Sequence, residues 1–485
     1  MLQTLPEALL LYLIISLPSQ VLAQTQIPLN SVISLTPQNL SSSTTEFRLP
    51  SSENLTISIA SCLSSSKFFI SNSTSEQSEL ELEDGIGVFS GRFVDGGTLT
   101  VEGIGEMEIG ASNNGPLHEY SQSLPMLGDT TANQAILFSA PFQQADINQP
   151  QYPNYTLSVP SKSEISVTPP ATTPNFTLVI QDSQTSTAGC LVTSSSSSPL
   201  NMSGTIVNST LWLRDAKEGW RMQWLVGGLT PSTNYTAYVI QGGKNISGPI
   251  RFLTKSASFS CPLVSSLPYC PGISYAVPLP QPDPPTSTYD HTNLPDTIQD
   301  PIIEYLTNFT ISLTTFACGR DWYSPLKTCA DCQNEYRKWL CTISFPRCGE
   351  ASPTSTSSES SSSTPGTQSR SLFARLIKRD GSDSDNQKPL PVSALTPVPT
   401  SAPPRNTAFP PFNETYNVLL PCLETCNAAD RACPASLGFK CPIAKFGAAQ
   451  TYGVGIIDGS EDDQQGMGSA GISQDRWGNV WCNAG

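Results

Sequence analysis

Histidine is almost absent from this chain, which has only His118 and His291 among its 485 residues. Acid–base and nucleophilic mechanisms most often use a histidine, so these two leave little room for such chemistry. Two glycine-containing segments fail as catalytic motifs as well. Residues 466–471 lack the spacing of a nucleophile elbow, and residues 453–458 lack the last glycine of a dinucleotide-binding loop. We therefore expect no enzyme, no catalytic residue and no cofactor.

Positive charge and long hydrophobic runs are also scarce. The 25 lysines and arginines are outnumbered by 40 aspartates and glutamates, and the net charge of −15 argues against a nucleic-acid partner. After residue 23 no uninterrupted apolar run approaches the roughly 18 to 20 residues that a membrane helix needs. The C-terminal residues after 450 contain no hydrophobic tail for a lipid anchor. We expect membrane association to depend on a partner.

The amino terminus predicts a signal peptide over residues 1–23. An apolar stretch at residues 8–17 is followed by Pro18 and by a Val21-Leu22-Ala23 ending that suits a signal peptidase. Glu7 stands where a basic residue is usual, so a buried helix of a cytosolic domain is the alternative. The sequence leaves open whether the segment is cleaved or kept as an anchor.

Eleven Asn-x-Ser/Thr sequons are compatible with a heavily glycosylated chain in the secretory pathway. We expect most of them to lie on exposed loops or strand faces and to carry glycan. The candidate sites are Asn39, Asn54, Asn72, Asn154, Asn175, Asn201, Asn208, Asn234, Asn245, Asn308 and Asn413.

Cysteine is rare in the first half of the chain and frequent in the second. In an oxidising compartment an even set of cysteines normally pairs, which favours disulfides over the zinc-site alternative. Neither histidine lies at ligand spacing from a cysteine pair. The acidic run at residues 380–385 lacks the glycine and glutamate of a calcium loop, so we expect no metal site. The disulfide candidates are Cys62, Cys190, Cys261, Cys270, Cys318, Cys329, Cys332, Cys341, Cys348, Cys422, Cys426, Cys433, Cys441 and Cys482.

Residues 24–255 have the short alternating segments of antiparallel β-structure, such as residues 97–102. The clearest stretch, residues 228–254, resembles the closing strands of a fibronectin type III sandwich, with Tyr235 at the sheet corner. We predict a β-rich, sandwich-like, glycosylated extracellular region. Cys62 and Cys190 are its only cysteines, and we suggest that they pair with each other.

Residues 351–408 are dominated by Ser, Thr and Pro, so we expect a disordered insert. Its Lys378-Arg379 pair is either a cleavage site or a solvated charge pair. If Cys62 pairs with Cys190, seven cysteines precede the insert and five follow it, so at least one disulfide crosses it. Residues 256–350 and 409–485 would then be two parts of one cysteine-rich domain.

An amphipathic helix is predicted between Cys329 and Cys348. Tyr336 and Trp339 fall on its apolar face, and Arg337 falls on the polar one. These three residues are candidates for partner contact, although an aromatic residue on such a face more often belongs to the core.

The cysteine spacings Cys332-x8-Cys341-x6-Cys348 and Pro421-Cys422-x3-Cys426-x6-Cys433 resemble those of frizzled-type cysteine-rich domains, which are mainly helical. That resemblance implies a set of pairs that sequence alone could not have selected. They are Cys261–Cys348, Cys270–Cys341, Cys332–Cys433, Cys422–Cys482 and Cys426–Cys441, with Cys318 and Cys329 left to pair together.

A closer resemblance rests on residues 268–278, on Cys329-x-x-Cys332, on residues 336–341, on Phe345-Pro346-Arg347-Cys348 and on residues 421–426. These segments resemble the fungal stretch-activated calcium-channel regulatory subunit family over essentially the whole chain. The resemblance implies a plasma-membrane complex with a large pore-forming subunit, in which calcium is the permeating ion. The animal relatives of that fungal family bind the outer side of a sodium-leak channel by means of a similar cysteine-rich domain.

The sequence therefore predicts an α+β multidomain protein that regulates a channel from the extracellular face. The alternatives are a secreted or cell-surface frizzled-like ligand-binding glycoprotein and, ranked last, a structural cell-wall glycoprotein. Which residues touch the partner, and whether this subunit senses tension, are left open.

Overall fold

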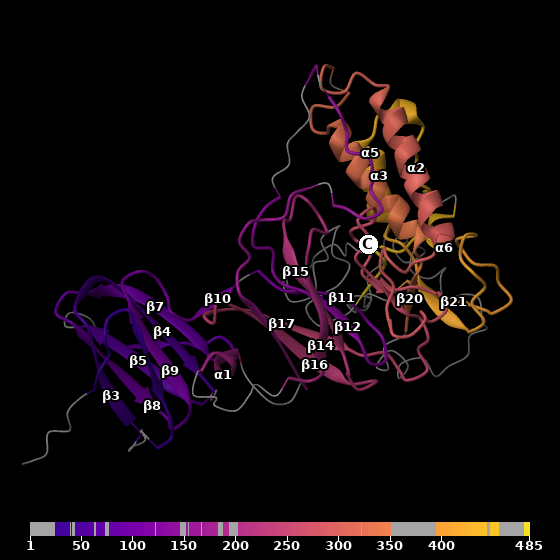
Figure 1. Cartoon of the computed structure of the whole chain (residues 1–485). Coiled ribbons are helices and arrows are strands. Elements are labelled where there is room, and N and C mark those ends of the chain that lie inside the picture. Colours follow the sequence, from indigo (N-terminus) through magenta and orange to yellow (C-terminus); the bar gives the residue numbers. More distant parts are fainter. Residues whose placement is uncertain are drawn as a thin grey trace, which may run out of the picture. The chain divides into compact units, whose positions relative to one another are not determined.

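The computed structural model divides the chain into two compact units, Met1–Leu117 and His118–Gly485, which we call the first and second units (Figure 1). The predicted signal peptide and the Lys378-Arg379 pair lie outside the residues that the structure describes. Those residues are 25–38, 40, 44–62, 65–72, 77–121, 123–145, 152–153, 155–165, 167–182, 188–193, 202–321, 323–350, 394–443, 447–454 and 480–485.

The first unit contains two β-sheets, in the orders β2-β9-β4-β7 and β1-β3-β8-β5-β6. All neighbours are antiparallel except β1 and β3, which run parallel. The strands are β1 (Thr25–Gln26), β2 (Ser31–Leu35), β3 (Thr44–Leu49), β4 (Ser52–Ser61), β5 (Lys67–Asn72), β6 (Ser78–Leu80), β7 (Ile86–Phe93), β8 (Gly97–Glu102) and β9 (Met107–Ser112).

Alternating apolar residues build the core of the first unit. Leu99 and Val101 of β8 are fully buried, and their cross-strand partners include Phe47 on β3 and Phe68 on β5. Such pairs stabilise a sheet because facing side chains on one face lie in contact. The predicted strand at residues 97–102 is confirmed as β8. The β-rich character predicted for the N-terminal half of the chain is confirmed as well.

Two four-stranded sheets form the β-rich part of the second unit, in the orders β11-β12-β15-β14 and β10-β17-β16-β13. Their strands are β10 (Glu119–Ser121), β11 (Met126–Thr130), β12 (Ala135–Phe138), β13 (Phe176–Asp182), β14 (Thr205–Trp212), β15 (Arg221–Gly227), β16 (Asn234–Gln241) and β17 (Asn245–Leu253). Short helix α1 (Ala188–Val192) follows β13. Tyr235 is buried, as expected, and its hydroxyl accepts a hydrogen bond from the Thr230 N–H at 2.9 Å.

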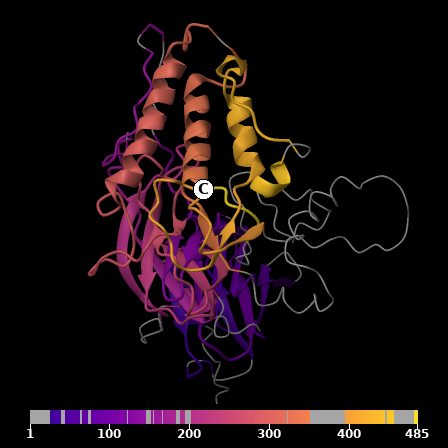
Figure 2. The ribbon, with the colours of Figure 1, turned by 90° about the vertical axis from the view of Figure 1, so that its right-hand side faces the viewer.

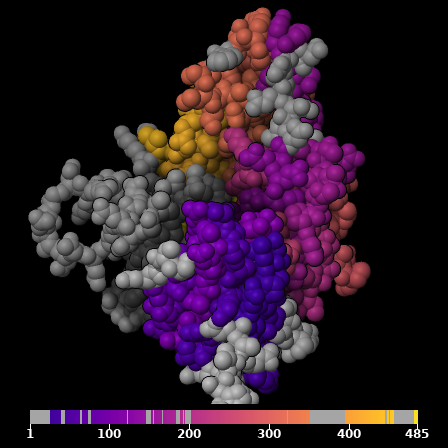
Figure 3. Space-filling model, turned by 90° about the vertical axis from the view of Figure 1, so that its left-hand side faces the viewer, coloured from indigo at the N-terminus to yellow at the C-terminus, as the bar shows by residue number. Residues whose placement is uncertain are grey.

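Three helices of the second unit stand side by side, α2 (Asp296–Thr314), α3 (Cys329–Ser344) and α5 (Leu423–Ala432) (Figure 2). We call them the helical layer. The space-filling view shows a gold surface beside the orange one, and α5 packs against α3 (Figure 3). The helix predicted between Cys329 and Cys348 is confirmed as α3, and Thr328 and Asp331 form a capping box at its start.

Short strands accompany the helical layer. They are β18 (Leu263–Val264), which pairs with β19 (Tyr275–Ala276), and the sheet β20-β22-β21, made of β20 (Arg347–Gly349), β22 (Tyr416–Leu419) and β21 (Leu395–Val398). The 3₁₀-helix η2 (Ala435–Leu437) and helix α6 (Ala448–Thr451) complete the unit. Among the described residues, no helix combines the length and the apolar composition that a membrane crossing needs.

The expectation of disorder through residue 408 is wrong for residues 394–408. Strand β21 lies inside this stretch and pairs antiparallel with β22, so that Thr396 faces Val418. The partner strand satisfies backbone groups that composition alone would leave to water. Residues 351–393 lie outside the described part of the chain.

Candidate functional site

Disulfides connect the elements of the helical layer. Six pairs are described after residue 260: five are the ones that the frizzled-type resemblance implied, and the sixth joins Cys318 to Cys329, which were left to pair together. They are Cys261–Cys348, Cys270–Cys341, Cys318–Cys329, Cys332–Cys433, Cys422–Cys482 and Cys426–Cys441. Cys62 and Cys190 are disulfide-bonded as well. The suggestion that these two pair with each other stays a prediction.

One of these six bonds crosses the insert. Cys332 on α3 is linked to Cys433 at the end of α5, a separation of 101 residues, whereas the other five bonds stay within residues 256–350 or within residues 409–485. A disulfide therefore joins the two cysteine-rich segments, as expected if Cys62 pairs with Cys190.

The aromatic candidates for partner contact pack inside the protein. The ring of Tyr336 stacks on Phe309 of α2 with 3.6 Å between ring centroids. Trp339 lies edge-on to Phe439 at 4.7 Å, and its Nε1–H donates to the Tyr452 hydroxyl at 3.0 Å. Both side chains are half-buried against the core, so the structure favours a packing role for them.

Arg337 differs from its two neighbours. It is half-buried, and its Nη2 donates to Asn334 Oδ1 one turn earlier at 3.0 Å. Burial lowers the pKa of Arg337. The negative charge of Asp215 opposes this shift, and no acidic side chain among the described residues lies within ion-pair distance of Arg337.

A buried ion cluster, which sequence reasoning missed, joins the sheets of the second unit to its cysteine-rich segments. The carboxylate of Asp129 on β11 lies 3.0 Å from Arg347 Nε and 3.5 Å from Lys255 Nζ. It also accepts the backbone N–H groups of Thr130 and Ala276. Burial alone would raise the pKa of the Asp129 carboxyl, but the two cations and these hydrogen bonds hold it below its usual value.

The ion cluster continues into a buried tyrosine. The Arg347 guanidinium lies 5.4 Å from the ring centre of Tyr275, whose hydroxyl donates to the Phe345 carbonyl at 2.9 Å. Asn483 Nδ2 donates to the same hydroxyl at 3.0 Å. Burial raises the pKa of Tyr275, so this side chain stays neutral. The arrangement is structural, because every charge in it already has a partner.

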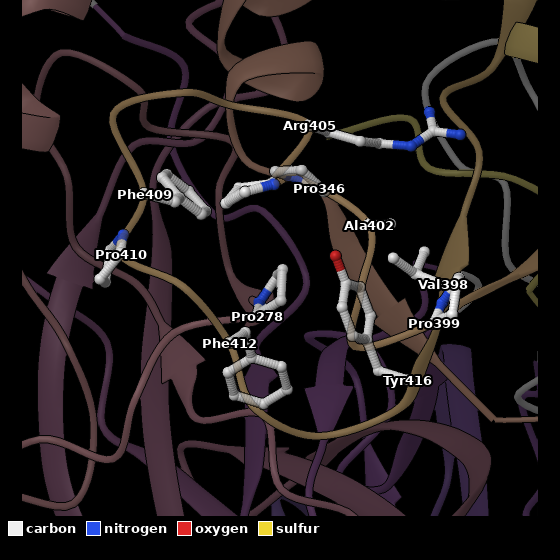
Figure 4. A pocket seen from close by; sticks show the side chains of 11 residues that line it. Pro278, Pro346, Val398, Pro399, Ala402, Arg405, Phe409, Pro410, Phe412 and Tyr416 are labelled. Atoms are coloured by element: carbon white, nitrogen blue, oxygen red, sulfur yellow. The ribbon is translucent and has the colours of Figure 1, made fainter.

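A shallow pocket opens at the base of the helical layer (Figure 4). It has a volume of about 340 Å³, counting the solvent open to it, and its walls are mainly proline and aromatic side chains. Phe409, Phe412 and Tyr416 supply the aromatic surface, and Arg405 supplies the one charge. Most of this volume is open solvent, so the pocket encloses space for little more than one water molecule, and its residues contain no acid–base pair.

The remaining polar candidates have structural explanations. Cys422, Glu424 and Cys482 lie close enough together to suggest a metal site, but both sulfur atoms belong to one disulfide and are not thiolate ligands. His118 is buried, and His291 Nδ1 lies 3.1 Å from the Ser266 carbonyl oxygen.

Most of the predicted glycosylation sites that the structure describes are accessible. Asn72 and Asn245 are half-buried, and Asn39, Asn154 and Asn201 lie outside the described residues. The exposed asparagines are Asn54, Asn175, Asn208, Asn234, Asn308 and Asn413.

The β-sheets and the disulfide-bonded helical layer define a cysteine-rich α+β protein of the kind expected outside the cytosol. Residues 58–467 match the Mid1 family, described as "Stretch-activated Ca2+-permeable channel component". The chain belongs to this family.

Three relatives carry the same kind of name. The stretch-activated cation channel MID1 of Cryptococcus neoformans is 35% identical over 443 residues, which are 85% of this chain and 67% of the relative. The stretch-activated cation channel yam8 of Schizosaccharomyces pombe is 27% identical over 74% of this chain and 64% of its own length. MID1 of Saccharomyces cerevisiae is 29% identical over 54% and 42%. The chain thus spans about two thirds or less of these relatives.

Solved structures add little. The pre-peptidase C-terminal domain of a Bacillus anthracis collagenase is 15% identical with a TM-score of 0.15, covering 18% of this chain and 93% of that domain. The chicken CNTN1 FN1-FN3 domains are 7% identical with a TM-score of 0.14, covering 48% and 69%. Scores this low carry no argument about the fold.

Proposed function

We propose that this chain is the extracellular regulatory subunit of a plasma-membrane calcium channel that opens under stretch and resembles voltage-gated channels. The match of residues 58–467 to a channel-component family carries the proposal. The chain would support calcium influx by assembling with a large pore-forming subunit, and calcium would be the permeating ion of the complex.

The cysteines support the proposed location. All of those that the structure describes are disulfide-bonded, which suits a chain that folds in the secretory pathway. We infer a signal peptide at residues 1–23, a glycosylated β-rich region over residues 24–255, and a frizzled-like cysteine-rich domain in two parts, at residues 256–350 and 409–485. The agreement of the disulfide pairs with the frizzled pattern supports the last assignment.

The α3 side of the helical layer, which carries Arg337, is the part we expect to dock on the pore subunit. Disulfides and the stacked aromatic rings make it rigid, and a rigid surface loses little conformational entropy on binding. Arg337 would provide a positive contact on it. A subunit of this kind biases gating by binding one channel state more tightly than another.

The apolar pocket of Figure 4 supports a second candidate function, a cell-surface ligand-binding glycoprotein that is not tied to a channel. Its proline and aromatic walls offer an open contact surface for an apolar or proline-rich segment, not a cavity that would enclose one. The ligand-binding function predicts that no membrane protein co-purifies with the chain.

Affinity purification separates the two candidates. A tagged full-length chain is purified from detergent-solubilised membranes of its native cell, and the co-eluting proteins are identified by mass spectrometry. We expect stoichiometric recovery of one large polytopic membrane protein. Recovery of the glycoprotein alone, in a form that needs no detergent, would refute the channel role and favour the ligand-binding one.

A further inference from the structure

Large hydrophobic side chains are exposed beside two of the predicted glycosylation sites in the second unit. On α2, Tyr305 is 62% exposed and Ile311 is 57% exposed, and the exposed Asn308 lies between them. On β14, Ile206 is 44% exposed and Val207 is 58% exposed, immediately before the exposed Asn208. Single exposed hydrophobic residues are ordinary, but pairs of them grouped around one sequon call for an explanation.

Tyr305 and Ile311, which we call the α2 patch, lie close to the sequon asparagine of the same helix. Residues three apart on a helix are neighbours, so Asn308 adjoins both Tyr305 and Ile311 on the exposed side of α2. The other side of the helix is buried in the core. Helical side chains lean toward the N-terminus, so a group attached to Asn308 lies over the turn that carries Tyr305.

Ile206 and Val207, which we call the β14 patch, lie on an edge strand of their sheet. In the order β11-β12-β15-β14, strand β14 pairs with β15 and has no second partner among the described strands. Ile206 and Asn208 pair with consecutive residues of β15, and Val207 is the extra residue of a bulge between them. An exposed hydrophobic edge strand can pair with another chain, and a bulky hydrophilic group on it prevents such pairing.

We propose that N-linked glycans on Asn208 and Asn308 cover these two apolar patches. The apolar C–H face of the first N-acetylglucosamine on Asn308 packs on the Tyr305 ring, and its hydroxyl groups face water. The glycan on Asn208 shields the neighbouring bulge residue Val207 and blocks strand addition at β14, whereas Ile206 pairs on the opposite face of the sheet. The inference rests on the secretory location in the proposed function, but not on the channel role.

The test uses the full chain secreted from eukaryotic cells. Glycopeptide mass spectrometry measures the occupancy of each sequon, and hydroxyl-radical footprinting measures the accessibility of the apolar side chains. In N308Q we expect oxidation of Tyr305 to rise several-fold, with a smaller rise at Ile311. In N208Q we expect a several-fold rise at Val207 with little change at Ile206, and self-association detected by light scattering.

The matched control is N413Q. Asn413 is an exposed sequon asparagine of the same unit, and no large exposed hydrophobic residue lies within three positions of it. Its loss should change neither footprint. Glycan at Asn413 with none at Asn208 and Asn308, or unchanged footprints in the two variants, would overturn this inference but leave the secretory location intact. A complete lack of glycan would overturn the secretory location with it.

Discussion

The cores of the two units differ in composition. In the first unit, aliphatic and aromatic residues from two sheets meet in one cluster that contains no cysteine, with Phe47, Phe68 and Leu99 among its fully or almost fully buried members. In the helical layer of the second unit, disulfide sulfurs are themselves part of the core clusters, and Cys332 and Cys433 pack beside Leu313. The first unit relies on the apolar surface between its sheets, whereas the helical layer adds covalent links to an apolar cluster of its own.

The largest effect should come from removing the disulfide that crosses the insert. We expect the double change Cys332→Ala/Cys433→Ala to lower the free energy of unfolding of the second unit by about 5 kcal/mol, because the bond closes a loop of roughly 100 residues. Urea denaturation followed by hydrogen exchange of each unit measures the loss.

The matched control for that bond is Cys318→Ala/Cys329→Ala, which opens a loop of 11 residues in the same layer. It should cost about 3 kcal/mol in the chain-entropy account. Equal losses for the two bonds would show that loop length does not explain how disulfides stabilise this layer.

The comparable change in the first unit is Phe68→Ala. This ring is fully buried and faces Val101, so its loss leaves a cavity and should cost about 4 kcal/mol. Unfolding of the first unit by urea measures the effect. The exposed Val88→Ala serves as the control, and a loss in Val88→Ala as large as in Phe68→Ala would contradict a core-based account of this unit.

The next effect concerns the buried ion cluster. Asp129→Asn leaves Arg347 and Lys255 without their carboxylate, and we expect the second unit to lose about 3 kcal/mol. Because the folded pKa of Asp129 is lowered, its contribution is complete above the unfolded pKa of about 3.9 and is lost as pH falls through the lower folded value.

Thermal unfolding of the wild type and Asp129→Asn between pH 7 and pH 3 tests this assignment. The difference in melting temperature between the two proteins should stay constant down to about pH 4 and narrow below it, as the unfolded chain begins to take up the proton. The exposed pair Arg320–Asp321 provides the control, since Asp321→Asn should cause no measurable change. A difference in melting temperature that stays constant down to pH 3 would exclude the Asp129 carboxylate as the source of the lost stability.

The smallest effect on stability should come from Arg337→Ala. The side chain is half-buried and has one hydrogen bond to its own helix, so we expect a loss of about 1 kcal/mol or less. Recovery of the pore subunit in affinity purification should fall several-fold, and Arg337→Lys should retain part of it. Unchanged recovery in Arg337→Ala would remove this residue from the docking surface.

The local elements could be predicted from sequence because their signals are local. Alternation at residues 97–102 specifies β8, and the apolar spacing around Tyr336 specifies α3. The disulfide pairs came from a family resemblance, since spacing alone permits many connectivities. The division between units at Leu117 and His118 was not predicted, although Asn113-Asn114-Gly115-Pro116 is a turn-forming sequence at that point.

Features that depend on distant residues could not be predicted. Asp129 and Arg347 are 218 positions apart, and no periodic pattern connects a carboxylate on one strand to a cation on another. Strand β21 was missed for a related reason, because a proline-containing segment becomes a strand only when a partner such as β22 lies beside it.

The bond between Cys332 and Cys433 also determines how the helical layer would respond to a mechanical load. It joins α3 to the end of α5 directly. A pull that acts on residues 409–485 relative to residues 256–350 therefore meets a covalent bond before α3 and α5 can separate. Under such a load the two segments would move together, and extension would have to occur elsewhere in the chain.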